Sequence, residues 1–131
     1  MQADDGNEGA VRGLPRLLLR MEGGVLLVAS ALLYAGLGVS WVAFVVLLLV
    51  PDVAMLGYMR GSRLGAVTYN LAHTYAPPAA LALIAALTGS NATYACALIW
   101  VAHIGMDRLL GYGLKYPTSF QHTHLGTIGR R

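Results

Sequence analysis

Four apolar stretches of about 20 residues each, the length of a membrane-spanning helix, follow one another along this chain of 131 residues. They cover residues 17–37, 40–59, 64–88 and 92–112. At a rise of about 1.5 Å per residue, a helix of that length crosses a hydrocarbon core of about 30 Å. Only 11% of the residues are charged, whereas soluble domains carry about 25%. The sequence therefore predicts an all-α integral membrane protein, an antiparallel bundle of four transmembrane helices.

The nine lysine and arginine residues all fall on one side of this predicted bundle. They precede the first helix, lie between the second and third, or end and follow the fourth: Arg12, Arg16, Arg20, Arg60, Arg63, Arg108, Lys115, Arg130 and Arg131. Cytoplasmic loops of membrane proteins carry an excess of such residues. We therefore expect a multi-pass protein of the plasma or inner membrane with both termini in the cytoplasm. This placement accounts for the net charge of +3 without a nucleic-acid partner.

The two ends of the chain are polar. Residues 1–13 are acidic rather than basic, so we interpret them as a short disordered leader and not as a signal peptide. Residues 14–112 form the predicted transmembrane domain, and residues 113–131 form a cytoplasmic tail. Two interpretations of the tail remain open. Its aromatic residues and Lys115 lie at the lipid interface, or it folds back on the bundle as a lid in which Lys115 and His124 bind an anionic group.

Ionisable side chains are predicted inside the membrane at nearly one depth. Counted at about 1.5 Å per residue from the nearest cytoplasmic charge, Asp52 and Asp107 lie about 12 Å deep and His73 about 15 Å. His103 is one turn deeper than Asp107 and shares its helical face, while Glu22 is shallower. Such groups cost several kcal/mol in hydrocarbon unless they face a partner or water. We therefore expect them to converge from different helices on one polar site.

Prolines lie next to these ionisable residues. Pro77 cannot donate a hydrogen bond to the carbonyl of His73, and Pro78 removes the next donor, so the third helix is predicted to kink there. Pro51 predicts a kink in the second helix one residue before Asp52. Free backbone carbonyls at this depth are tolerated where they line a polar cavity enclosed by protein.

Two imidazoles and two or three carboxylates from different helices are typical of a metal site inside a helical bundle. The predicted ligands are Asp52, His73, His103 and Asp107. This combination suits zinc, iron or manganese. Tyr69 and Asn70 lie on the same stripe as His73 and are expected to contact the bound cofactor. The alternative is a hydrogen-bonded polar cluster that fixes helix packing and binds nothing.

Three segments carry a family resemblance: "PDVAMLGYMRGSRLGAVTYNLAHTY", "WVAHIGMDRLLGYGLKY" and "FQHTHLG". They closely resemble the domain-of-unknown-function 4260 family of small bacterial four-helix membrane proteins, over residues 20–131. The resemblance implies a membrane location and a polar set whose counterparts here are Glu22, Asp52, Tyr58, Asn70, His73, His103, Asp107, Lys115, Tyr116 and His124. It implies no activity.

One functional hypothesis is a membrane-embedded, metal-dependent hydrolase, in which the ion lowers the pKa of a bound water. Glu22 or His124 would act as general base or acid. Lys115 would attract an anionic, lipid-like substrate at the inner leaflet. The layout is similar to that of membrane-bound metal-dependent hydrolases, which is an analogy of arrangement and not of motif.

Two other classes of protein stay open. In a structural or interaction protein the polar cluster would only fix the fold. In a small transporter the same cluster would bind the cargo, but the outer half of the predicted bundle is almost wholly apolar. Four helices also leave little room for alternating access, so a transporter would need to be a homodimer.

Overall fold

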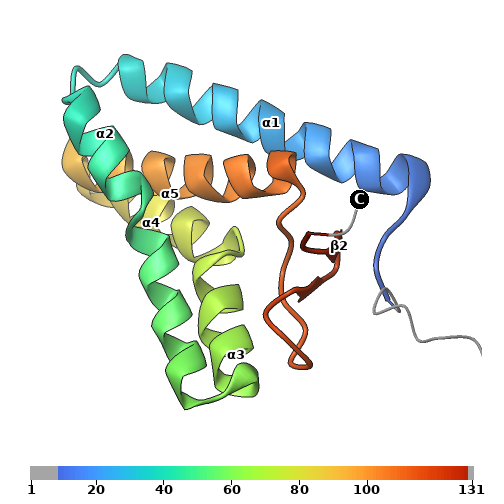
Figure 1. Ribbon diagram of the computed structural model, residues 1–131. Helices are drawn as coiled ribbons and strands as arrows, with labels where there is room; N and C mark the ends of the chain where they lie inside the picture. Colours follow the sequence, from blue (N-terminus) through green and yellow to red (C-terminus); the bar gives the residue numbers. More distant parts are fainter. Residues whose placement is uncertain (1–8, 130–131) are drawn as a thin grey trace, which may run out of the picture.

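The computed structural model describes residues 9–129, and these are mostly helical (Figure 1). The helices are α1 (Gly13–Ala35), α2 (Trp41–Leu48), the 3₁₀ helix η1 (Val50–Arg60), α3 (Ser62–Ala72), α4 (Ala76–Thr88) and α5 (Asn91–Leu110). Two short strands follow, β1 (His122–Thr123) and β2 (Gly126–Thr127), which pair antiparallel. Most of the expected leader, residues 1–8, lies outside the described residues.

Three helical stretches are long enough and apolar enough to cross a membrane: Gly13–Ala35, Trp41–Arg60 and Ser62–Thr88. Most of their large apolar side chains are exposed, as lipid-facing helices require. The prediction of a mostly helical protein with stretches long and apolar enough to span a membrane is therefore confirmed. The fourth predicted helix corresponds to α5, which is not among these three stretches and which carries two of the four clustered residues, His103 and Asp107.

The second and third stretches are each divided in two, as the prolines predict. η1 begins at Val50 with Pro51 in its first turn, and Asp52 donates its backbone N–H to Leu49 O in an i to i−3 pattern. α3 ends at Ala72 because the following prolines cannot extend its hydrogen bonding. α4 then starts at Ala76 with those prolines in its first turn, where a missing N–H costs nothing.

The helices pack in two groups that meet at α5. α1 lies along α5, and α2 and α4 also pack against α5 (Figure 1). The other group is η1 with α3, which pack on each other and run away from α1 and α5. Glycines permit the closest approaches: Gly23 of α1 meets Gly105 of α5, and Gly57 of η1 meets Thr68 of α3. The polar residues lie where the two groups join.

The chain after α5 folds back beside α3 (Figure 1). α5 ends at Leu110, and the positive φ of the following Gly111 reverses the chain. The Asn70 side chain then accepts from Lys115 N (2.7 Å) and donates to Lys115 O (2.8 Å), much as a neighbouring strand would. Leu125 is fully buried, and Val11 donates its backbone N–H to His124 O (2.8 Å). The tail is thus attached to α3 and to the segment before α1.

Candidate metal centre

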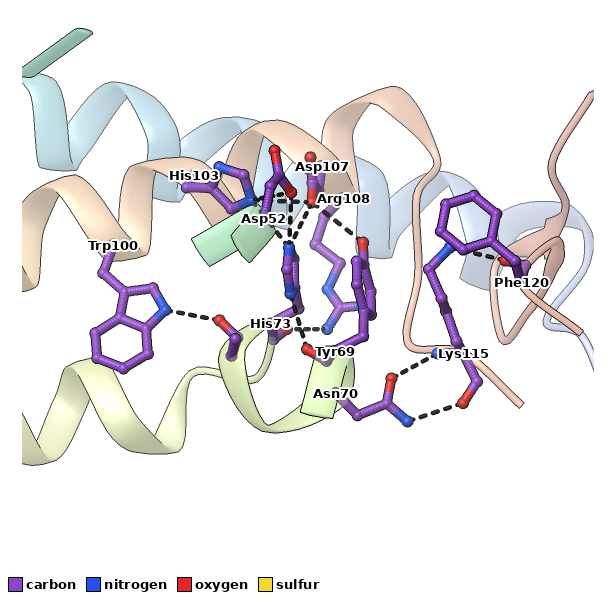
Figure 2. A network of polar contacts seen from close by, with 11 residues as sticks. Asp52, Tyr69, Asn70, His73, Trp100, His103, Asp107, Arg108, Lys115 and Phe120 are labelled. Atoms are coloured by element: carbon purple, nitrogen blue, oxygen red, sulfur yellow. Dashed lines mark hydrogen bonds and ion pairs between the residues drawn. The ribbon is translucent and has the colours of Figure 1, made fainter. Parts of the chain in front are cut away.

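Asp52, His73, His103 and Asp107 come together in the fold with one donor atom each within 4.8 Å of every other (Figure 2). Asp52 lies in the first turn of η1, and His73 directly follows α3. His103 and Asp107 lie one turn apart on α5. The two proline breaks therefore place two ligands opposite the two on α5, as Figure 2 shows.

The distances between these donor atoms are those of a compact coordination shell. His73 Nε2 lies 3.0 Å from His103 Nε2. Asp52 Oδ1 lies 3.3 Å from each of these nitrogens, and Asp107 Oδ2 lies 3.5 Å from His73 Nε2 and 3.4 Å from His103 Nε2. Atoms about 2.1 Å from one ion are about 3.4 Å apart in a tetrahedron and about 3.0 Å apart at right angles. One ion can therefore be reached by all four donor atoms.

The cluster is closed on the histidine side and open on the aspartate side. The side chains of His73 and His103 are 3% and 1% exposed, whereas those of Asp107 and Asp52 are 13% and 37% exposed. A site with buried nitrogens and a partly accessible carboxylate leaves room for a water or a substrate next to the bound ion.

Tyr69 holds His73 in place. His73 Nδ1 carries a proton, because it donates to the carbonyl of Tyr69 (2.8 Å) and a carbonyl only accepts. Its Nε2 is left with a lone pair that points into the cluster. The Tyr69 ring stacks on the imidazole at 3.7 Å between centroids, and the Tyr69 hydroxyl donates to Asp107 Oδ2 (3.4 Å). Such partners orient metal ligands and fix the histidine tautomer.

Two side chains of α5 satisfy carbonyls that the break after α3 leaves free. Arg108 donates from Nη2 to His73 O (3.1 Å), and Trp100 donates from Nε1 to Ala72 O (2.6 Å). These two carbonyls therefore bind protein donors. The sequence alone does not indicate this role of Trp100, which lies about one turn before His103 on the same helix.

A cavity of about 290 Å³ opens beside the two carboxylates. It is lined by Asp52, Met55, Tyr69, Asp107, Tyr112, Lys115, Phe120 and Ile128. Four of these residues belong to the segment after α5. The folded-back tail therefore forms one wall of the cavity, and the carboxylates of Asp52 and Asp107 lie in the other.

Lys115 is buried in that wall, with only 4% of its surface exposed. Its ammonium group donates to Phe120 O (2.8 Å) and lies 3.5 Å and 4.5 Å from the ring centres of Phe120 and Tyr69 (Figure 2). Burial lowers the pKa of Lys115 to about 8, although the negative charges of Asp107 and Asp52 act against this shift. The side chain is thus a cation at neutral pH that faces the cavity and not the lipid interface.

His124 and Glu22 are not part of the cluster. His124 Nδ1 accepts the backbone N–H of Leu114 (2.8 Å), so its imidazole is neutral. Burial and the nearby Arg108 lower the pKa of His124, which favours that neutral form. Glu22 is exposed on α1. The two groups expected to transfer protons therefore lie outside the set of four ligands.

Comparisons with known proteins agree with the resemblance in the sequence. No curated protein and no solved structure matches this chain. A family model described as a domain of unknown function, DUF4260, matches residues 16–128 and so covers the helices that build the site, together with most of the tail. The chain is a member of the DUF4260 family.

Proposed function

We propose that this protein binds one divalent metal ion through Asp52, His73, His103 and Asp107 and uses it to hydrolyse an amphiphilic substrate in the membrane. The observation that carries the proposal is that two histidine nitrogens lie 3.0 Å apart and each lies 3.3–3.5 Å from both carboxylate oxygens, with the four residues drawn from separate parts of the chain. Two neighbouring carboxylates repel each other unless a cation or proton lies between them. The donor set suits zinc, iron or manganese.

The site would lie in the cytoplasmic half of a bundle with four antiparallel crossings. The positions of the cations support this placement, since none lies in the connections after α1 and after α4. Both termini would then be cytoplasmic, and the protein would belong to the plasma or inner membrane. His103 and Asp107 are 12 and 16 residues from the first residue of α5, about 18 and 24 Å along a helix of about 30 Å.

The chemistry follows from the ion and the residues around it. A bound divalent ion would supply a hydroxide at neutral pH by lowering the pKa of water. Tyr69 would keep Asp107 and His73 oriented through its hydroxyl and its ring. Lys115 would hold a negatively charged part of the substrate across the cavity. The positions of Glu22 and His124 do not support an acid–base role for either.

Two cavities next to the cluster support an amphiphilic substrate. The one described above contains Lys115 and the carboxylates. A second cavity of about 290 Å³ is almost entirely apolar, and its lining includes Pro51, Ala72 and Trp100. Pro51 and Ala72 immediately precede Asp52 and His73, so this cavity lies next to the segments that carry these two ligands. An anionic head would fit the first cavity, and a hydrocarbon chain would fit the second.

The test is elemental analysis of the detergent-purified protein beside single variants. We expect about one zinc, iron or manganese ion per chain. The His73→Ala and His103→Ala variants should lose the ion, because each removes one of the two nitrogen ligands among the four. His122→Ala is the matched control, because His122 is a histidine whose ring contacts Thr118 in the tail and not the cluster. It should keep the metal. All variants must elute as monodisperse species.

A metal-free native protein, even after reconstitution with each ion, would contradict the proposal. The cluster would then be a hydrogen-bonded group that fixes helix packing, as in a structural protein, and one contact favours this second function. His103 Nε2 could donate to the lone pair of His73 Nε2 at 3.0 Å without any ion. In that case His103→Gln should lower stability and change nothing else. Metal binding without turnover of lipid-like esters or phosphates would leave a metal site but no hydrolase.

A further inference from the structure

Two arginines of α1 lie side by side next to the end of α5. Arg16 and Arg20 are about one helical turn apart, so they lie on the same face of α1. A Cβ atom on Gly111 would lie 3.8 Å from Arg16 Nη2 and 3.9 Å from Arg20 Nε. Both guanidinium groups therefore converge on the point where α5 ends, although like charges at this spacing repel each other.

Most of the hydrogen-bond donors of these two arginines are unused. Within residues 9–129, Arg16 forms no hydrogen bond and no ion pair, and its Nε–H is buried. A buried donor without an acceptor is destabilising. Arg20 uses only Nε, which donates to Leu109 O (2.9 Å). Since a guanidinium carries five N–H donors, the pair can still bind an acceptor with several oxygens.

The turn between β1 and β2 packs on the Arg16 guanidinium. A Cβ atom on Gly126 would lie 3.4 Å from Arg16 Nη2, and the φ of Gly126 is +120°, a value that suits glycine. Main chain therefore approaches Arg16 from two sides, at Gly111 and at Gly126. The tail holds this guanidinium in place before any ligand arrives, which lowers the entropic cost of binding.

The same turns of α1 also carry an exposed apolar surface. Four large side chains there are 49–65% exposed: Leu14, Leu17, Leu18 and Met21. In the proposed orientation these residues meet acyl chains at the inner side of the bilayer. Arg16, in the first turn of α1, then lies at the level of the headgroups. The inner leaflet carries anionic phospholipids.

We propose that Arg16 and Arg20 bind a phosphate group at the inner surface of the bilayer, where the headgroup of an anionic phospholipid supplies it. The planar fork of an arginine matches two phosphate oxygens, and a second arginine can contact the others. The phosphate charge would offset the repulsion between the arginines and give the buried Nε–H an acceptor. The proposal uses the membrane location in the proposed function and does not depend on the metal.

Native mass spectrometry of the detergent-purified protein tests this site. The probes are dioleoylphosphatidylglycerol, dioleoylglycerol, which has the same chains and no phosphate, and inorganic phosphate as a competitor. We expect one phosphatidylglycerol to stay bound per chain and dioleoylglycerol not to bind. Arg16→Gln should weaken the binding of phosphatidylglycerol about tenfold or more, because it removes a charge-assisted contact. Inorganic phosphate should compete only at much higher concentration than the lipid, because it has no chains to bury.

Arg60→Gln with Arg63→Gln is the matched control. These two arginines are also close in sequence and lie on the same side of the predicted bundle, but both are exposed. The double variant removes more positive charge than Arg16→Gln does. It should nevertheless keep the native affinity for phosphatidylglycerol, because affinity depends on the site and not on net charge.

A stability measurement separates binding from a structural role of Arg16. In detergent without lipid or phosphate, Arg16→Gln should be at least as stable as the native protein. The substitution removes no hydrogen bond to the described residues and relieves the repulsion with Arg20. Added phosphatidylglycerol should raise the unfolding temperature of the native protein and not that of the variant, because a ligand stabilises only the form that binds it.

Four results would overturn the proposal or a stated part of it. Equal binding of dioleoylglycerol would show that no phosphate is recognised. An equal loss of lipid in the Arg60 and Arg63 control would show attraction by overall charge. Unchanged lipid binding by a destabilised Arg16→Gln would show that Arg16 is structural. Inorganic phosphate that competes as well as the lipid would overturn the lipid as the source. Metal content is measured separately and decides only the metal centre.

Discussion

At the scale of single residues, Lys115 is held in an unusual environment. A buried ammonium group normally has a charged partner, because its transfer from water is costly. Here the partners are one carbonyl and two aromatic rings. This arrangement leaves N–H donors of the ammonium for a ligand in the cavity, and it lowers the pKa to about 8 from the ordinary 10.5. Because the pKa of Lys115 differs between the folded and unfolded states, the stability of the protein should depend on pH.

We expect the native protein to gain stability relative to Lys115→Met as the pH rises from 7 to 9.5. Folded Lys115 loses its proton near pH 8, whereas the unfolded chain keeps it until about 10.5. Between these values the unfolded state binds more protons, so the free energy of unfolding increases with pH. Thermal unfolding of both proteins in detergent at several pH values measures this. Identical pH profiles would show that Lys115 is not buried as a cation.

At the scale of elements, a glycine contact fixes the distance between α1 and α5. A Cβ atom on Gly105 would lie 2.5 Å from the carbonyl oxygen of Gly23 and 2.9 Å from the backbone nitrogen of Leu27. Both neighbours are backbone atoms, which cannot move aside without moving the helix. Small residues are the usual means by which membrane helices approach closely. Gly105 also lies between the two ligands that α5 supplies, so this contact sets where they lie.

Gly105→Ala should destabilise the protein by about 1–3 kcal/mol, because the added methyl group overpacks the α1–α5 contact. In an unconstrained helix the same change would stabilise by up to about 1 kcal/mol. Gly24→Ala is the matched control, since its Cβ would meet only the flexible end of the Leu109 side chain at 3.2 Å. Unfolding in a denaturing detergent compares the three proteins. Equal stability of the two variants would contradict the close contact.

At the scale of the whole molecule, the positive charges are separated from two of the connections between helices. The connections after α1 and after α4 lie at one end of α5, and the tail lies at the other (Figure 1). All cations of the described residues belong to segments away from those two connections. This separation of charge favours one orientation of the molecule in the bilayer.

Cysteine labelling of intact cells tests that orientation. In the Cys96→Ser background, Gly36→Cys and Asn91→Cys should react with a membrane-impermeant maleimide, because they lie in or next to the two connections that are extracellular in the proposed orientation. Ser62→Cys and Thr118→Cys should react only after the cells are permeabilised. The opposite pattern would falsify the orientation, and labelling from both sides would show a mixed topology.

Much of the element pattern could be predicted from local sequence. Apolar runs, prolines and ionisable residues each act over a few residues, so they predict helices, breaks and depth directly. The kinks at Pro51 and Pro77 follow from one missing donor each. The convergence of Asp52, His73, His103 and Asp107 was also predictable, because ionisable side chains inside a membrane are stable only where they face a partner or water.

Other properties depend on contacts between segments distant in the chain. The close packing of η1 on α3 depends on Gly57, which meets Thr68, and on Gly65, which meets Tyr58, and no periodicity encodes the angle between these helices and the rest of the molecule. Lys115 is buried because Asn70, which lies 45 residues earlier, binds its backbone. Helical periodicity reports only which face of a segment is apolar. Which faces meet, and at what angle, is decided by side-chain packing across the whole molecule.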